Sequence, residues 1–178
     1  MIIAIMIGRR GSSGLPGKNT LPILGLPLSE YPLLVAGKSK SIERVYVSTD
    51  APELMEIGRK HGAHIIERPD YLCTNQALGE DAYVHAHGII KDELNKINIE
   101  PTLYVLLMAN SPTVNEELVE EGISALMSDQ MLDSAVTVSA YNMWSPLRAR
   151  RINDEGLLDP FVPFETFGNP DRKSTRLN

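Results

Sequence analysis

The sequence has little cysteine, no long apolar run and no excess of positive charge. Cys73 is the only cysteine, so no internal disulfide can form, which favours a reducing compartment such as the cytoplasm. The apolar start, residues 2–7, is too short for the core of a signal peptide and lacks a basic flank, and no run approaches the ~20 residues of a membrane span. We therefore expect a cytoplasmic protein that does not enter a membrane.

The balance of charge excludes a further class of partner. The formal net charge is −6 over 178 residues, and no stripe of lysine and arginine runs along the chain, so nucleic acid is not expected as a ligand. With 43% hydrophobic residues, the chain has the composition of one globular domain. Against this acidic background, the basic residues near the N-terminus suit a small anionic ligand.

Short apolar segments alternate with segments of helical periodicity. Runs rich in Val, Ile, Leu and Tyr predict strands at 2–7, 44–48, 64–67, 103–108 and 135–139. Apolar residues at three- and four-residue spacing predict helices at 31–38, 51–61, 80–95 and 115–128. We expect Asp50 to cap the second helix. The solvated face of the last helix is expected to hold Glu116, Glu117, Glu120 and Glu121. The alternation predicts an α/β fold with a mostly parallel sheet.

A glycine-rich, cationic loop follows the first predicted strand. It spans residues 8–19 and holds Arg9, Arg10 and Lys18. Glycines let backbone N–H groups approach an anion, and the basic side chains add charge. The spacing excludes a P-loop, because Ser12 stands where the first glycine is required and asparagine follows the lysine. Glycine at every third position also excludes a dinucleotide fingerprint. The loop predicts phosphate binding, with an ordinary surface turn as the alternative.

The same loop resembles the first signature of a known enzyme family. Its pattern is similar to that of the acylneuraminate cytidylyltransferases, or CMP-sialic acid synthetases: Arg9-x-x-Ser12-x-Gly14-Leu15-Pro16-x-Lys18-Asn19. Three further family landmarks follow in the same order: Val47-Ser48-Thr49-Asp50, Glu67-Arg68-Pro69 and Leu106-Leu107-x-x-x-Ser111-Pro112. The resemblance spans about residues 2–150. It implies a three-layer, Rossmann-like nucleotide-diphospho-sugar transferase fold, in which residues 1–170 form a cytidylyltransferase domain that is incomplete at its C-terminus.

The resemblance implies a reaction and its participants. CMP would pass from CTP to an acidic sugar, a sialic acid or related nonulosonic acid, with release of pyrophosphate, for surface glycan biosynthesis. Mg²⁺ would be the cofactor, and its aspartate ligands would lie beyond residue 170, where the family has them. The full-length protein would be a homodimer.

The resemblance also implies roles for individual residues. The catalytic cations would be Arg9 and Lys18, which would neutralise phosphate oxygens and stabilise the leaving pyrophosphate. The nucleotide-binding residues would be Arg9, Ser12, Lys18, Asn19, Arg68 and Ala77. The sugar-binding residues would be Met108, Asn110 and Arg148, with Arg150 and Arg151 as alternatives to the last. Because most of these residues follow parallel strands, we expect them to converge at one edge of the sheet.

Several positions depart from the family pattern. Ser13 stands where the family often has lysine, and Met108 and Asn110 stand where sialic acid synthetases usually have glutamine and threonine. These departures keep open an enzyme for another sugar acid, such as Kdo, or for another base. The metal ligands are expected beyond residue 170, where the native sequence is expected to stop. A nucleotide-binding fragment without turnover is therefore a further alternative.

The last eight residues look foreign to the rest of the chain. Residues 171–178, Asp-Arg-Lys-Ser-Thr-Arg-Leu-Asn, are the translation of GAT CGG AAG AGC ACA CGT CTG AAC, which resembles a common sequencing-adapter sequence. We expect the native sequence to stop near Pro170 and residues 171–178 to be a non-native tail.

Overall fold

The computed structural model describes residues 1–11, 14–138 and 150–160. By its internal contacts the chain divides into two compact units, Met1–Val136 and Thr137–Asn178. In the second unit the described part is a hairpin of two antiparallel strands, β7 (Arg150–Ile152) and β8 (Leu158–Pro160). The first unit holds all the other described elements.

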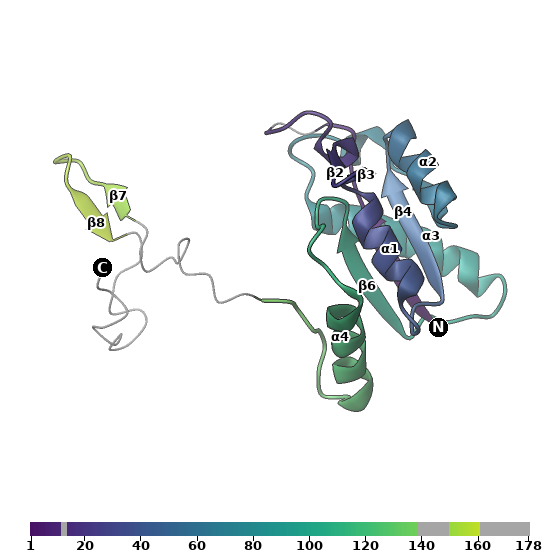
Figure 1. Cartoon of the computed structure of the whole chain (residues 1–178). Coiled ribbons are helices and arrows are strands. Elements are labelled where there is room, and N and C mark those ends of the chain that lie inside the picture. The colour runs from purple at the N-terminus through teal and green to yellow at the C-terminus, as the bar shows by residue number, and fades with distance from the viewer. Residues whose placement is uncertain (12–13, 139–149, 161–178) are drawn as a thin grey trace. The chain divides into compact units, whose positions relative to one another are not determined.

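The centre of the first unit is a parallel sheet of four strands (Figure 1). Their order across the sheet is β5 (His64–Glu67), β4 (Arg44–Thr49), β1 (Ile2–Ile7) and β6 (Leu103–Met108). Four of the five predicted strands are thus confirmed. The strands end nearly in register, since Ile7 pairs with both Ser48 and Met108. Their carboxyl ends therefore lie at one edge of the sheet.

Four helices connect and cover the strands, as the apolar periodicity predicts. Their bounds are α1 (Glu30–Lys38), α2 (Pro52–Lys60), α3 (Gly79–Asn95) and α4 (Glu116–Ser128). The smaller elements are the 3-10 turns Lys18–Thr20 and Asp70–Leu72 and the two-residue strands β2 (Pro22–Ile23) and β3 (Leu26–Pro27). In the part of the chain that the structure describes, no helix is long and apolar enough to cross a bilayer.

The alternating side chains of β1 build one core on each face of the sheet. Ile3, Ile5 and Ile7 pack under α3, whereas Ala4 and Met6 pack on the face that α1 and α2 cover. None of these five residues is more than 8% exposed. Helices on both faces of a parallel sheet give the predicted three-layer α/β arrangement.

The prediction of a fifth strand at 135–139 is wrong for residues 135–138, which form no strand. Val136 and Val138 are 78% and 91% exposed. Alternating apolar residues form a stable strand only against a neighbouring strand and a covering layer. Within the described residues β6 is the edge of the sheet, and nothing pairs with it on its outer side.

The predicted cap of α2 is also wrong. The N-cap residue is Ala51, and it makes no side-chain capping bond. The carboxylate of Asp50 instead accepts a hydrogen bond from the backbone N–H of Arg10 (2.8 Å). A tertiary contact with the glycine-rich loop thus replaces the local capping bond that the sequence suggested. For α4 the capping residue is Asn115, whose side chain accepts from the N–H of Leu118 (2.8 Å).

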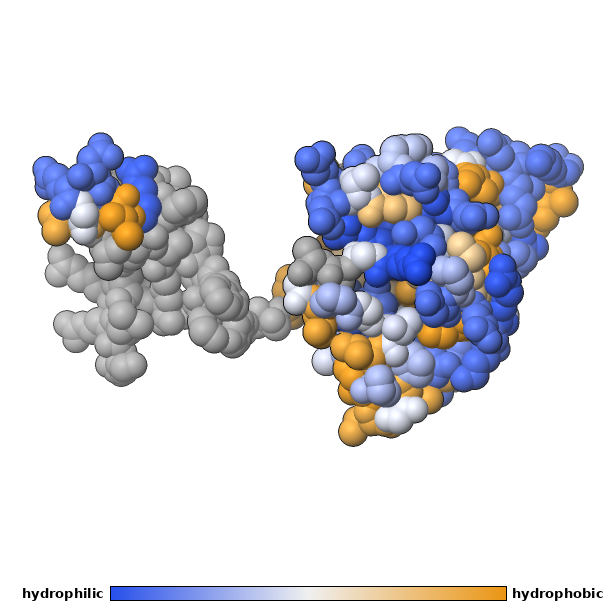
Figure 2. All heavy atoms as spheres, turned by 90° about the horizontal axis from the view of Figure 1, so that it is seen from above, coloured by the Kyte–Doolittle hydropathy of each residue, from blue (hydrophilic) through white to orange (hydrophobic). Residues whose placement is uncertain are grey.

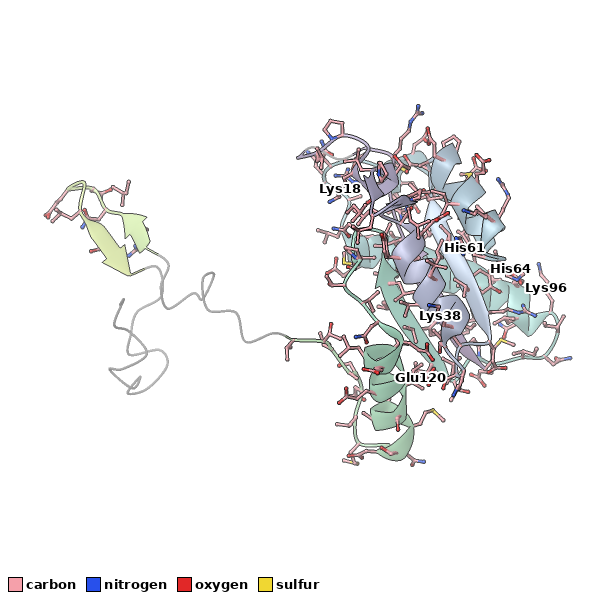
Figure 3. The ribbon with its side chains drawn as sticks, in the orientation of Figure 1. Lys18, Lys38, His61, His64, Lys96 and Glu120 are labelled. Carbon is pink, nitrogen blue, oxygen red and sulfur yellow. The ribbon has the colours of Figure 1, made fainter. Side chains whose placement is uncertain are left out.

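Glu120 on α4 is partly exposed, and it also makes a tertiary contact that the prediction of a solvated face does not include. Its carboxylate accepts hydrogen bonds from the hydroxyls of Ser39 (2.5 Å) and Ser41 (2.6 Å) and from the backbone N–H groups of Lys40 (2.9 Å) and Ser41 (3.2 Å). Figure 3 shows Glu120 on the part of α4 next to the end of α1. The hydrogen bonds from Ser39 and Ser41 lower the pKa of Glu120 to about 2. This carboxylate therefore attaches α4 to the segment that follows α1.

Candidate active site

The strand order of the sheet reverses at β1. From β1 the chain proceeds to β4 and β5 on one side, and it then returns to place β6 on the other side. The segments that follow β1, β5 and β6 all leave the sheet at this carboxyl edge, next to the point where the strand order reverses, which is where open α/β sheets bind ligands. Figure 1 shows the N-terminal loop at this end of the sheet, and Figure 2 looks onto the same end, where hydrophilic atoms cover much of the surface.

A cavity of about 450 Å³ lies at this point. One wall is the glycine-rich loop, a second is the segment after β5, and a third is the segment after β6. Seven of the predicted site residues line it: Arg9, Lys18, Asn19, Arg68, Ala77, Met108 and Asn110. The expected convergence at one sheet edge is therefore present. Ser12 and Arg148 lie outside the described residues.

Hydrogen bonds hold the start of the loop on both sides of Arg9. The Arg9 guanidinium donates to the carbonyl oxygen of Cys73 (3.4 Å), and the Arg9 carbonyl oxygen accepts from the side-chain amide of Asn19 (3.3 Å). Asp50 accepts from the next backbone N–H, that of Arg10 (2.8 Å). Contacts from two distant segments and from the far end of the loop itself therefore hold the residues that carry the first two cations.

Two glycines make this loop path possible. A Cβ atom on Gly8 would lie 2.8 Å from the Cβ of Ala109 and 3.0 Å from a methyl group of Leu54, so only glycine lets the loop pass between β6 and α2. Gly17 has a φ of 66°, in the left-handed region that side chains disfavour. It sets the turn that brings Lys18 and the buried Asn19 back toward Arg9.

Arg68 joins the ends of two strands. It is only 6% exposed, and its guanidinium donates to the carbonyl oxygen of Ser48 (2.7 Å) and to the Ser48 hydroxyl (3.4 Å). Burial lowers the pKa of Arg68, and the neighbouring Cys73 and Asp50 act in the opposite direction. Because much of its donor capacity is used within the protein, Arg68 supports the cavity floor as well as lining it.

The segment after Arg68 forms one wall of the cavity. The N–H of Ala77 donates to Thr74, to its carbonyl oxygen (3.4 Å) and to its hydroxyl (3.2 Å). Leu78 and Gly79 line the cavity beside it and lead directly into α3.

Sequence reasoning missed two supporting residues. The sequence predicts Asp50 only as a helix cap, whereas its carboxylate accepts from the backbone N–H of Arg10. Tyr83 on α3 donates its hydroxyl to the carbonyl oxygen of Leu107 (2.7 Å), and burial raises its pKa. This bond holds α3 against the end of β6 beside the cavity. The periodicity of α3 indicates only that Tyr83 lies on the apolar face of the helix. The sequence holds no signal for its hydrogen bond, because the acceptor is a backbone oxygen, which every residue has.

No metal-binding group is present in the described residues. Within 1–11, 14–138 and 150–160, no three His, Cys, Asp or Glu side chains lie close enough together to hold a cation. The aspartate ligands that the resemblance implies would lie past residue 170, outside this range. The residues that form the cavity therefore offer cations to a ligand and do not offer carboxylates to a metal.

Known proteins match this chain over most of its length. The family model for cytidylyltransferases matches residues 3–149. N-acylneuraminate cytidylyltransferase of Escherichia coli is 29% identical over 160 residues, which are 90% of this chain and 36% of that protein. CMP-N,N'-diacetyllegionaminic acid synthase of Legionella pneumophila is 26% identical over 157 residues, which are 88% of this chain and 65% of that protein.

Solved structures agree with these matches. A CMP:2-keto-3-deoxy-manno-octonic acid synthetase in complex with CTP superposes with a TM-score of 0.59 and 25% identity, over 74% of this chain and 49% of the other. A cytidylyltransferase from Leptospira borgpetersenii shares the fold, with a TM-score of 0.54 and 22% identity over 72% of this chain and 50% of the other. The chain spans between 36% and 65% of the length of the two curated relatives named above. The chain belongs to the cytidylyltransferase family.

Proposed function

We propose that the protein transfers CMP from CTP to an acidic sugar, a sialic acid or related nonulosonic acid, and releases pyrophosphate for surface glycan biosynthesis. The observation that carries the proposal is the cavity at the carboxyl ends of β1 and β6, which brings the cationic loop together with Arg68 and Asn110. Relatives named N-acylneuraminate cytidylyltransferase and CMP-N,N'-diacetyllegionaminic acid synthase support the choice of both substrates.

The proposed reaction joins two negatively charged reactants. The anomeric hydroxyl oxygen of the sugar attacks the α-phosphorus of CTP, and the bond from that phosphorus to the bridging oxygen of the β-phosphate breaks. Pyrophosphate leaves with the electron pair, and the hydroxyl proton passes to solvent. Arg9 and Lys18, which line the cavity, act because cations beside the phosphate oxygens reduce repulsion and stabilise the charge on the leaving group.

The remaining predicted residues take places around this centre in the proposal. Arg68 and the backbone at Ala77 bind the cytosine end, and Asn19 binds the ribose region. Asn19 lines the cavity, and its side-chain amide donates to the carbonyl oxygen of Arg9 (3.3 Å), which keeps it beside the cations of the loop. Met108 and Asn110 bind the sugar in this proposal. Ser12 keeps its predicted role in nucleotide binding, and Arg148 keeps its predicted role in sugar binding.

The proposal extends to the cofactor, the assembly and the compartment. Mg²⁺ is the proposed cofactor, and when bound it would neutralise negative charge on the phosphates. Its ligands are expected beyond residue 170, so no step is assigned to it through the described side chains. The whole protein is proposed to be a cytoplasmic homodimer that binds neither nucleic acid nor membrane.

A specific observation favours a second candidate. The CTP complex with 25% identity to this chain is a synthetase for 2-keto-3-deoxy-manno-octonic acid, which is also an acidic sugar. Met108 and Asn110 line the cavity at the positions where the sequence departs from the sialic acid pattern. An enzyme for that sugar acid would use the same nucleotide site. The further possibility, a nucleotide-binding fragment without turnover, shares that site as well.

Nucleotide selectivity tests the proposal most simply. A ligand that binds only the folded state raises the apparent stability of the protein, so thermal unfolding is measured with CTP, UTP, GTP and ATP in the presence of Mg²⁺. We expect the largest upward shift in midpoint with CTP. Equal shifts with all four nucleotides, or no shift in a folded sample, would contradict the choice of CTP.

Two matched variants locate the binding site in the same assay. Lys18→Ala removes a cation from the cavity wall, and it should abolish most of the shift with CTP. Lys38→Ala removes the same charge from the last turn of α1, where Figure 3 shows it well away from Lys18, and it should leave the shift unchanged. A panel of CMP-accepting sugar acids, with pyrophosphate release as the readout, then separates the candidate sugars.

A further inference from the structure

Tyr83 is the side chain that joins the start of α3 to the end of β6. Its hydroxyl donates to the carbonyl oxygen of Leu107 (2.7 Å), and the two residues are 24 positions apart in the chain. Its ring packs against the apolar core between α3 and the sheet. In the part of the chain that the structure describes, this is the one hydrogen bond between α3 and β6.

The two partners of this bond stand next to two different walls of the cavity. Gly79, the first residue of α3, lines the wall after β5 and precedes Tyr83 by about one helical turn. Leu107 is followed directly by Met108, Ala109 and Asn110, which line the wall after β6. The distance between these walls therefore depends on a bond that lies one turn from the first wall and one residue from the second.

The other contacts of α3 near this point are packing contacts. A Cβ atom on Gly79 would lie 3.5 Å from the Cδ1 of Ile7, so the start of the helix packs on the end of β1. Farther along the helix, His87 packs edge-on against Tyr104 near the start of β6, with ring centroids 5.0 Å apart. Packing contacts tolerate small shifts, whereas a hydrogen bond is directional. Tyr83 thus supplies the directional contact at the end of α3 that lies beside the cavity.

The environment of Tyr83 keeps its hydroxyl a donor. Burial raises the pKa of Tyr83, and the guanidinium of Arg68 acts in the opposite direction. The hydroxyl is therefore protonated at neutral pH and can donate to Leu107. Arg68 lines the cavity, whereas Tyr83 does not. Any effect of Tyr83 on a ligand must therefore pass through the two walls that it joins.

We infer that Tyr83 is a positioning residue, which sets the spacing between the wall that binds the nucleotide and the wall that binds the sugar acid. The inference rests on the proposed function, in which Ala77 lies at the cytosine end and Met108 and Asn110 lie at the sugar end. The CMP-sugar product spans both walls, so it gains affinity from the second wall only where the spacing fits. CMP alone contacts the nucleotide wall, and its affinity does not depend on the spacing.

The ratio of two affinities tests this role. Titration calorimetry with the whole chain measures the binding of CMP and of CMP-N-acetylneuraminate. Tyr83→Phe keeps the ring and removes only the hydroxyl. It should weaken binding of CMP-N-acetylneuraminate about tenfold and binding of CMP by less than about twofold, because only the ligand that spans both walls depends on their spacing. A purely structural role would lower the unfolding temperature and leave the ratio of affinities in the folded protein unchanged.

Tyr46→Phe is the matched control. The hydroxyl of Tyr46 on β4 donates to the carboxylate of Glu93 (3.0 Å), so it also ties α3 to the sheet, but near the other end of the helix. Tyr46 does not line the cavity, and Tyr46→Phe should leave the ratio of affinities unchanged. The positioning role is overturned if Tyr83→Phe keeps the wild-type ratio, or if Tyr46→Phe lowers the ratio as much as Tyr83→Phe does.

Failure of this inference can be told apart from failure of the proposed function. A wild-type chain that prefers CTP and binds CMP-N-acetylneuraminate more tightly than CMP, with a ratio that does not respond to Tyr83→Phe, would contradict the positioning role alone. A wild-type chain that binds neither CMP-N-acetylneuraminate nor CMP-Kdo more tightly than CMP would show that the two walls do not hold one ligand. That result would contradict the proposed function and the positioning role together.

Discussion

The central strand and the loop that follows it are neighbours in sequence, yet different forces hold them. Between Ile3 and Met6 the strand is 0–1% exposed, so burial of apolar surface holds it in place. Arg10 is exposed, and hydrogen bonds to Asp50 and Cys73 hold the start of the loop. Stability should therefore depend mainly on the strand and ligand binding mainly on the loop. Variants in the loop should leave stability largely intact, and variants in the strand that still fold should leave ligand binding largely intact.

The largest expected effect is on the strand. Ile5→Ala empties part of the core under α3, where Ile5 is 1% exposed, and it should lower the free energy of unfolding by about 2–5 kcal/mol. Urea denaturation measures this change. Leu24→Ala is the control, because Leu24 is 95% exposed and such surface changes stay within about 0.5 kcal/mol. Equal losses in the two variants would contradict the division between strand and loop.

The second-largest effect is expected at Asp50, whose carboxylate holds the start of the loop, and it is an effect on CTP binding. Asp50→Ala removes the acceptor of the Arg10 N–H, and the loss of about 1 kcal/mol for an unmatched donor should weaken CTP binding roughly fivefold. Asp50→Asn retains an acceptor oxygen, so it should recover most of the affinity. Calorimetric titration with CTP compares the three proteins. If Asp50→Asn binds CTP as weakly as Asp50→Ala, the hydrogen bond from Arg10 does not determine CTP affinity.

A smaller effect is expected at Glu120, which does not line the cavity. Because its pKa is lowered to about 2 from an ordinary 4.5 in the unfolded chain, the bonded carboxylate stabilises the fold above pH 4.5, and this contribution is lost as the pH falls toward 2. Glu120→Ala should therefore have a lower unfolding temperature than the wild type at pH 7, and the two curves should converge near pH 2. A difference that does not depend on pH would contradict this assignment.

The smallest change in stability is expected at the sugar end of the cavity. Met108 is 49% exposed, so Met108→Gln should alter the free energy of unfolding by less than about 0.5 kcal/mol. The substitution restores the residue that sialic acid synthetases usually have, and it should shift the preference among sugar acids toward N-acetylneuraminate. Pyrophosphate release with CTP and each sugar measures the preference. An unchanged ranking of sugars would remove Met108 from the sugar site.

Elements with strong periodicity could be predicted from the sequence because one physical signal dominates each of them. The apolar run of β1 and the stripe of Ala86, Ile90 and Leu94 on α3 each have one way to be buried. The wrong strand at 135–139 had a suitable pattern, but residues 135–138 have no neighbouring strand to complete it. Pattern alone specifies a strand only when the tertiary structure offers a partner.

The functional site likewise combines residues that could be placed from the sequence with residues whose roles could not be predicted. The residues that follow parallel strands could be placed at one edge of the sheet from topology alone, which is why Lys18, Arg68 and Asn110 line one cavity as expected. The roles of Asp50 and Glu120 could not be predicted, because each carboxylate bonds a segment far away in sequence in place of its own helix end or solvent.

The most direct test of the central claim is a map of where CTP binds. Backbone amide signals of the isotopically labelled chain are followed by NMR during titration with CTP and Mg²⁺. The account predicts that the perturbed amides cluster in the loop at 8–19 and around Ala77 and Asn110, which line the cavity. Perturbations confined to the distant end of α3 or to α4, or none at saturating CTP, would contradict a nucleotide site at the carboxyl ends of β1 and β6.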